Sequence, residues 1–139
     1  MRSESEREVM KTSVRGFIAG SAVVTLLNGC ASDNYHFSQV VGDRYFKTNI
    51  DTYPVEIASV DGRYYLGRAP VLVDPGVRQI VVQGPATVVD LRLTREIALD
   101  VQPCTRYYLV AQKANPLDND FAVRVDFEQP IAGCTPPPK

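Results

Sequence analysis

Apolar and polar residues alternate along much of the chain, and the pattern is clearest in residues 121–128. One face of that segment holds Phe121, Val123, Val125 and Phe127, whereas the other holds Ala122, Arg124, Asp126 and Glu128. A period of two residues is that of a β-strand with one buried face. We therefore predict a half-buried strand here, with the Phe121 to Phe127 side in the core.

Six further segments have the composition of short strands, and turn residues separate most of them. The segments are 53–60, 64–66, 71–73, 77–83, 97–101 and 106–112. Asp61-Gly62 predicts a tight hairpin, because both central residues of a type I′ turn need a positive φ. Asp74-Pro75-Gly76 predicts a second turn. About seven short strands with no 3.6-residue period indicate an all-β fold, a small antiparallel β-sandwich. Residues 86–95 fit either a strand or an irregular segment.

The same pattern divides the 139 residues into four parts. We predict the sandwich over residues 51–134. Residues 30–50 are polar with scattered aromatics and predict a tether that ends by packing onto the domain. Residues 135–139 form a proline-rich tail, which cannot join a sheet. Residues 1–29 have the features of an export signal and are set apart from the fold.

The export signal rests on charge and on the length of one apolar stretch. Lys11 and Arg15 precede an apolar run over 17–27, which is too short for the roughly 20 residues that span a bilayer. The run ends in Leu27-Asn28-Gly29-Cys30, which resembles the lipobox of bacterial lipoproteins. The resemblance implies that Cys30 carries a covalent lipid and becomes the new N-terminus, so that the partner of this end is a membrane.

Two details refine the export interpretation. Acidic residues precede Lys11, and a start at Met10 instead of Met1 would give a conventional positively charged signal. Ala31 follows the cysteine, whereas lipoproteins kept at the inner membrane resemble one another in having Asp there. By that analogy we expect the periplasmic side of the outer membrane, in an organism that has one.

Charge and cysteine content limit the remaining possibilities. A formal net charge of −1 argues against a nucleic-acid partner. Beyond Cys30, the chain holds only Cys104 and Cys134, an even pair in an oxidising compartment. We expect them to form a disulfide, because the start of one strand and the end of its antiparallel neighbour lie side by side; two free thiols are the alternative. Two cysteines and one histidine do not make a structural zinc site.

Part of the body resembles known modules. The segments 55–62, 67–71 and 74–76, with the apolar strand that follows, look like a PEGA-type repeat, which is similar to the transthyretin-like regulatory domains of carboxypeptidases. Residues 103–113 and 130–134 resemble uncharacterised small bacterial lipoproteins. The first resemblance implies a β-sandwich on a bacterial surface, and the second implies a family without an activity.

Candidate chemistry is sparse. The only histidine, His36, lies in the predicted tether, and no catalytic residue set, cofactor motif or metal-ligand spacing is present. Asp118-Asn119-Asp120 fits a turn better than a calcium loop. The weak candidate for recognition is the outer face that carries Tyr108, Arg124, Asp126 and Glu128; the alternative is a solvated face that protects a sheet edge.

These observations favour a non-enzymatic, membrane-anchored envelope lipoprotein whose sandwich is an interaction or structural module. Its partner would be another envelope protein or the cell wall. An envelope enzyme, or a lipoprotein that binds a small ligand at a site not visible in the sequence, remains the alternative. No cofactor is expected besides the lipid on Cys30.

Overall fold

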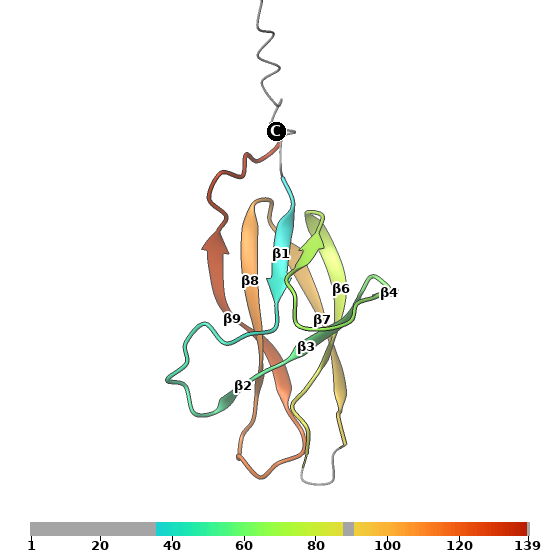
Figure 1. Ribbon diagram of the computed structural model, residues 1–139, viewed down its shortest axis with the longest axis vertical. Coiled ribbons are helices and arrows are strands. Elements are labelled where there is room, and N and C mark those ends of the chain that lie inside the picture. The colour runs from blue at the N-terminus through green and yellow to red at the C-terminus, as the bar shows by residue number, and fades with distance from the viewer. Residues whose placement is uncertain (1–35, 88–90, 139) are drawn as a thin grey trace, which may run out of the picture. The chain divides into compact units, whose positions relative to one another are not determined.

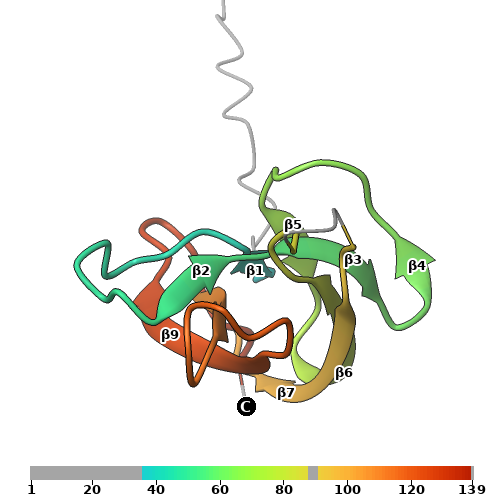
Figure 2. The same ribbon diagram turned by 90° about the horizontal axis from the view of Figure 1, so that it is seen from below.

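The alternating segments form β-strands in the computed structural model, which describes residues 36–87 and 91–138. The described part contains nine strands and no helix. One sheet has five strands, β1 (Ser38–Val41), β2 (Thr52–Pro54), β5 (Val71–Val73), β8 (Thr105–Gln112) and β9 (Ala122–Pro130). The other sheet has four, β3 (Glu56–Val60), β4 (Arg63–Tyr64), β6 (Gly76–Gln83) and β7 (Thr94–Val101). Figures 1 and 2 show the two layers, so the predicted all-β sandwich is confirmed.

β8 is the centre of the first sheet. β9 pairs with its whole length on one side, whereas β1 and β2 share the other side, one after the other. The β1–β8 pair is parallel, and the other pairs are antiparallel. The second sheet is fully antiparallel, in the order β4-β3-β6-β7.

The sandwich begins earlier than the sequence pattern indicated. Residues 38–41 were expected in a tether, but they form β1, which lies between β8 and β5. Val40 is fully buried there and Val41 nearly so, so two apolar residues in a polar segment are enough to add this strand to the sheet. The uncertain segment 86–95 becomes strand only from Thr94 onward, and residues 88–90 lie outside the described part.

The core lies between the sheets. It consists of buried apolar side chains from both layers, mainly Val40, Val55, Ile57, Val60, Val71, Val73, Ile80, Val82, Leu99, Val101, Tyr107, Leu109, Ala111 and Phe121. Burial at roughly 25 cal/mol per Å² of apolar surface is the main stabilising contribution of such a core. Buried polar groups within it are satisfied: the Tyr107 hydroxyl accepts the Gln102 N–H at 2.8 Å, and Ser38 Oγ accepts the Thr105 N–H at 3.0 Å.

The predicted hairpin turn at Asp61-Gly62 and the predicted disulfide between Cys104 and Cys134 are both present. Asp61 and Gly62 have φ values of +47° and +80°, as a type I′ turn between β3 and β4 requires. Cys104 and Cys134 are joined as a disulfide with their Cα atoms 5.4 Å apart. The bridge connects the turn before β8 to the segment after β9, so it fastens the C-terminal segment to the end of the sheet where β1 begins (Figure 1).

Candidate functional site

The loop between β1 and β2 covers part of the predicted recognition face. The β8–β9 register shifts between Tyr108 and Leu109, so that Leu109 pairs with Val125, whereas Tyr108 pairs with Phe127. Asp126 is the extra residue of this β-bulge, which reverses the side-chain alternation beyond it. Phe127 is therefore not in the core, as the period of two had indicated, but on the outer side of the sheet with Tyr108.

Asp126 holds the loop between β1 and β2. Its Oδ2 accepts the backbone N–H groups of Tyr45 and Phe46, both at 3.1 Å, and Arg124 lies 3.4 Å from its Oδ1. The Asp126 side chain is only 1% exposed. The expectation of a solvated carboxylate at this position was wrong, because the loop covers it and uses it as an acceptor.

Aromatic rings complete the contact between this loop and the sheet. Tyr45 stacks on Phe127 with ring centroids 3.9 Å apart, and the Tyr108 and Phe46 rings contact the stack edge-on. Such ring pairs add about 0.5–1.5 kcal/mol each beyond area burial. Of the four predicted recognition residues, Glu128 is the most exposed, whereas Arg124 is half-buried and its Nε is buried without a hydrogen-bond partner in the described part.

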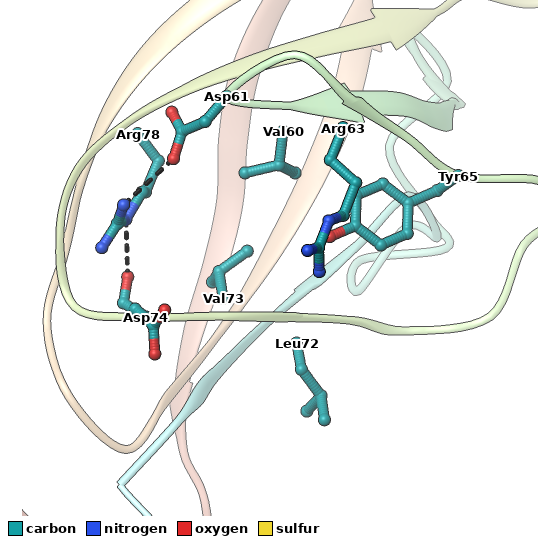
Figure 3. A pocket seen from close by; sticks show the side chains of 8 residues that line it. All are labelled: Val60, Asp61, Arg63, Tyr65, Leu72, Val73, Asp74 and Arg78. Carbon is teal, nitrogen blue, oxygen red and sulfur yellow. Dashed lines mark hydrogen bonds and ion pairs between the residues drawn. The ribbon is translucent and has the colours of Figure 1, made fainter.

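A second surface lies on the other side of the sandwich, where the β3–β4 hairpin projects away from the β1–β2 loop (Figure 2). A cavity of about 260 Å³ opens there between the β3–β4 hairpin and the turn that joins β5 to β6. Figure 3 shows its lining residues, which are Val60, Asp61, Arg63, Tyr65, Leu72, Val73, Asp74 and Arg78. None of them is a serine, cysteine or histidine.

One side of the cavity is held rigid by Arg78. Its guanidinium donates to Asp61 Oδ2 at 3.0 Å, to the Asp74 carbonyl at 2.9 Å and to the Pro75 carbonyl at 2.8 Å. The Asp61 Oδ1 accepts the Gln79 N–H at 2.9 Å. These hydrogen bonds from Gln79 and Arg78 hold the pKa of the Asp61 carboxyl below its ordinary value of 3.8. Arg78 thereby connects the turn at Asp61 to the turn at Asp74 and Pro75.

The other polar side chains of the cavity have no bonding partner among the described residues. The guanidinium of Arg63, the hydroxyl of Tyr65 and the carboxylate of Asp74 make no hydrogen bond or ion pair with any described residue. Arg63 and Tyr65 enter the cavity from β4 and the residue after it, whereas Asp74 lies with Arg78 on the opposite side (Figure 3). One cation, the Arg63 guanidinium, and one anion, the Asp74 carboxylate, thus line the same cavity without a partner among the described residues.

Two exposed apolar side chains lie at this hollow or at the cavity beside it. Leu72 is 51% exposed and Leu66 is 99% exposed. An adjoining cavity of about 310 Å³ shares Arg63, Tyr65 and Leu72 with the first. We call the region formed by Arg63, Tyr65, Leu66, Leu72 and Asp74 the hairpin corner. It combines apolar contact area with polar groups that lack partners, which is the usual composition of a binding surface.

Sequence reasoning identified both turns but missed the hairpin corner. Asp61-Gly62 and Asp74-Pro75-Gly76 are recognisable as turn residues, yet nothing in the sequence places the two turns beside each other. The adjacent tyrosines of the predicted strand 64–66 were a usable signal, because neighbouring strand residues point to opposite faces. Tyr65 packs on the core, and Tyr64 points to solvent.

Other predicted features have simpler roles. The segment Asp118-Asn119-Asp120 lies in the turn between β8 and β9, where the Asp118 N–H donates to the Asn115 carbonyl at 3.0 Å and the Leu117 N–H donates to the Asn115 Oδ1 at 2.9 Å. His36 stacks on Phe37 with ring centroids 4.8 Å apart. Within residues 36–87 and 91–138, no group of three His, Cys, Asp or Glu side chains is placed to hold a metal ion. Over the same residues, no helix has the length and apolarity needed to cross a membrane.

The predicted signal peptide and Cys30 lie outside the described residues. Comparisons of the chain with protein-family models, with curated proteins and with solved structures found no match.

Proposed function

We propose that this chain is a lipid-anchored protein of the bacterial cell envelope and that its sandwich is a non-enzymatic binding module. The observation that carries the proposal is the hairpin corner, where exposed apolar side chains adjoin polar groups without partners. Adjacent exposed apolar side chains and polar groups without partners are a common composition of binding surfaces. The cavity also favours the second candidate, a lipoprotein that binds a small ligand.

The anchor is proposed from the sequence. Cys30 follows an apolar run of signal-peptide length, and Cys104 and Cys134 form a pair. A disulfide is typical of exported proteins, because cytosolic thiols are kept reduced. A single acyl chain holds a protein only reversibly, whereas several acyl chains, at about 0.8 kcal/mol per buried methylene, anchor it stably.

The anchor is tested by metabolic labelling with an alkyne-tagged fatty acid, followed by membrane fractionation. We expect the wild-type chain to carry the label and to sediment with the membranes. Cys30→Ser should lose the label and either become soluble or persist as an unprocessed precursor. The double variant Cys104→Ser/Cys134→Ser is the control, and it should still be labelled. A Cys30→Ser chain that is trimmed and still membrane-bound would show that the anchor is wrong.

The binding role is tested by site-specific photo-cross-linking in intact cells. A photoreactive residue replaces Leu66 in the hairpin corner, and the matched control replaces Leu117, which is 85% exposed in the turn between β8 and β9. We expect a discrete adduct of reproducible mass from position 66 and none from position 117. Equal labelling from both positions, or from neither, would contradict the proposed binding surface.

A further inference from the structure

We propose that the cavity of the hairpin corner binds a small zwitterionic ligand, an amino acid or short peptide, with its carboxylate on Arg63 and Tyr65 and its ammonium group on Asp74. The inference rests on the binding role proposed for this corner and adds the chemical class of the ligand. It follows from the charges that line the cavity, from which of them are already paired, and from the size of the space.

The charges of the cavity separate into a satisfied pair and an unsatisfied pair. Asp61 and Arg78 lie 3.0 Å apart and neutralise each other. Arg63 and Asp74 each lack a partner among the described residues. The lining therefore has no net charge but presents one free cation and one free anion. A simple anion on Arg63 would leave Asp74 without a partner, and a simple cation on Asp74 would leave Arg63 without one, whereas a zwitterion matches both ends.

Arg63 on β4 and Tyr65, the residue after β4, are the groups that would hold the carboxylate of the ligand. A guanidinium is planar and can donate two parallel hydrogen bonds to one carboxylate, which makes such pairs stronger than neutral hydrogen bonds. Tyr65 is half-buried and packs on the core, so its ring is held in place while its hydroxyl remains without a partner. In Figure 3 both side chains enter the cavity from the same side.

Asp74, in the turn between β5 and β6, is the group that would hold the ammonium group of the ligand. Arg78 holds the backbone carbonyls of Asp74 and Pro75 at 2.9 and 2.8 Å, so the turn that carries the Asp74 carboxylate is fixed before any ligand arrives. A preorganised acceptor loses little conformational entropy on binding. Asp74 lies across the cavity from Arg63 in Figure 3.

The space restricts the body of the ligand. The cavity volume of about 260 Å³ is below the roughly 300–1,000 Å³ of most small-molecule pockets. Val60 and Val73, which are nearly fully buried, present a small apolar area between the charged ends. A ligand with small apolar side chains, such as an alanyl peptide, satisfies both conditions.

The test is a titration of the purified full-length chain in mild detergent, followed by backbone NMR shifts. The probes are alanine, Ala-Ala and Ala-Ala-Ala, each compared with its N-acetylated form and its C-terminal amide. We expect at least one free probe to bind, with shifts concentrated around Arg63 and Asp74. Either cap should weaken its binding about tenfold, since each removes one charge-assisted contact.

Two variants assign the ends of the ligand. Arg63→Gln should abolish the difference between the free peptide and its amide, and Asp74→Asn should abolish the difference between the free and acetylated peptides. Arg92→Gln and Asp118→Asn are matched controls away from the cavity and should keep both differences. Because the side chains of Arg63 and Asp74 make no hydrogen bond or ion pair with a described residue, both variants should fold normally, which thermal unfolding checks.

Three outcomes would overturn the inference: no probe binds, capped and free probes bind equally, or inorganic phosphate binds more tightly than every free probe. If an adduct still forms at position 66 in cells, these outcomes remove the ligand class but leave the binding role of the corner. If the adduct is also absent, the proposed function fails with it.

Discussion

At the scale of single residues, Asp61 performs two tasks in one turn. Its backbone adopts a φ of +47°, which Asp and Asn tolerate better than other non-glycine residues. Its carboxylate accepts the Gln79 N–H and pairs with Arg78, and these contacts lower its pKa below 3.8. The pKa of Asp120 is lowered in the same way, by hydrogen bonds from Arg95 and from the Phe121 N–H.

The lowered pKa of Asp61 predicts an acid-sensitive contribution to stability. In the folded chain Asp61 binds a proton less readily than in the unfolded chain, so its contribution is present above pH 3.8 and is lost as the pH falls through the folded pKa. We expect Asp61→Asn, which suits the same turn, to flatten the fall in melting temperature between pH 5 and pH 2. Asp118→Asn should leave the slope unchanged, and an unaltered slope in Asp61→Asn would contradict the assignment.

Gly42 and Gly84 predict a graded response to one added methyl group. At Gly42 a Cβ would overlap the carbonyl oxygen of Val55, whose own N–H donates to the Gly42 carbonyl at 2.8 Å. At Gly84 it would overlap the ring of Phe121, which is a side chain with rotatable bonds, whereas the Val55 carbonyl belongs to the backbone. We expect Gly42→Ala to lower the free energy of unfolding by about 2–3 kcal/mol and Gly84→Ala by about 1 kcal/mol. Urea unfolding measures both, and the reverse order would refute this explanation.

At the scale of elements, the bulge in β9 decides what each face of the first sheet carries. It moves Phe127 outward to meet Tyr45 and leaves Asp126 beneath the β1–β2 loop. The loop is therefore fixed to the sheet by one buried acceptor and by stacked rings, rather than by strand pairing.

Asp126 should be the most sensitive position of this contact. Asp126→Ala leaves the Tyr45 and Phe46 N–H groups without their acceptor, so we expect a loss of about 2 kcal/mol in the free energy of unfolding. Amide hydrogen exchange at residues 45 and 46 should accelerate. Asp126→Asn, which keeps an acceptor oxygen, should lose less. Unchanged exchange in Asp126→Ala would show that the rings alone hold the loop.

At the scale of the whole molecule, the disulfide ties the C-terminal segment to the sandwich. Ile131 N–H also donates to the Cys104 carbonyl at 2.8 Å, so a hydrogen bond supports the bridge. The core side chains come from both sheets and do not depend on the residues after β9.

Removing the bridge should weaken the fold without abolishing it. The two cysteines are 30 residues apart, and closing a loop of that size contributes about 3–4 kcal/mol in the chain-entropy model. We expect Cys104→Ala/Cys134→Ala to lower the melting temperature and to keep the far-ultraviolet circular dichroism of the wild type. Because Cys104 has a φ of +60°, Cys104→Gly/Cys134→Ala should lose less. A wild-type melting temperature in the alanine variant would refute a stabilising bridge.

The sequence alone determined the features that depend on neighbouring residues. The period of two identified the central and C-terminal strands, because adjacent side chains of a strand point to opposite faces. Asp61-Gly62 identified its turn, because a positive φ is a property of those residues themselves. The cysteine pair followed from the antiparallel arrangement of the strands on either side of one turn.

Tertiary structure decided the features that depend on distant residues. β1 joins the sheet because β8 and β5, both distant in sequence, pair with it on either side. Phe127 lies outside the core because one extra residue in β9 changes the pairing with β8. The alternation of residues within β9 cannot predict this shift, because the register depends on the partner strand as well. Arg63 and Asp74 line one cavity because Arg78 connects the two turns that carry or flank them. Strand pairing and packing between sheets, which act across the whole chain, therefore placed the candidate site.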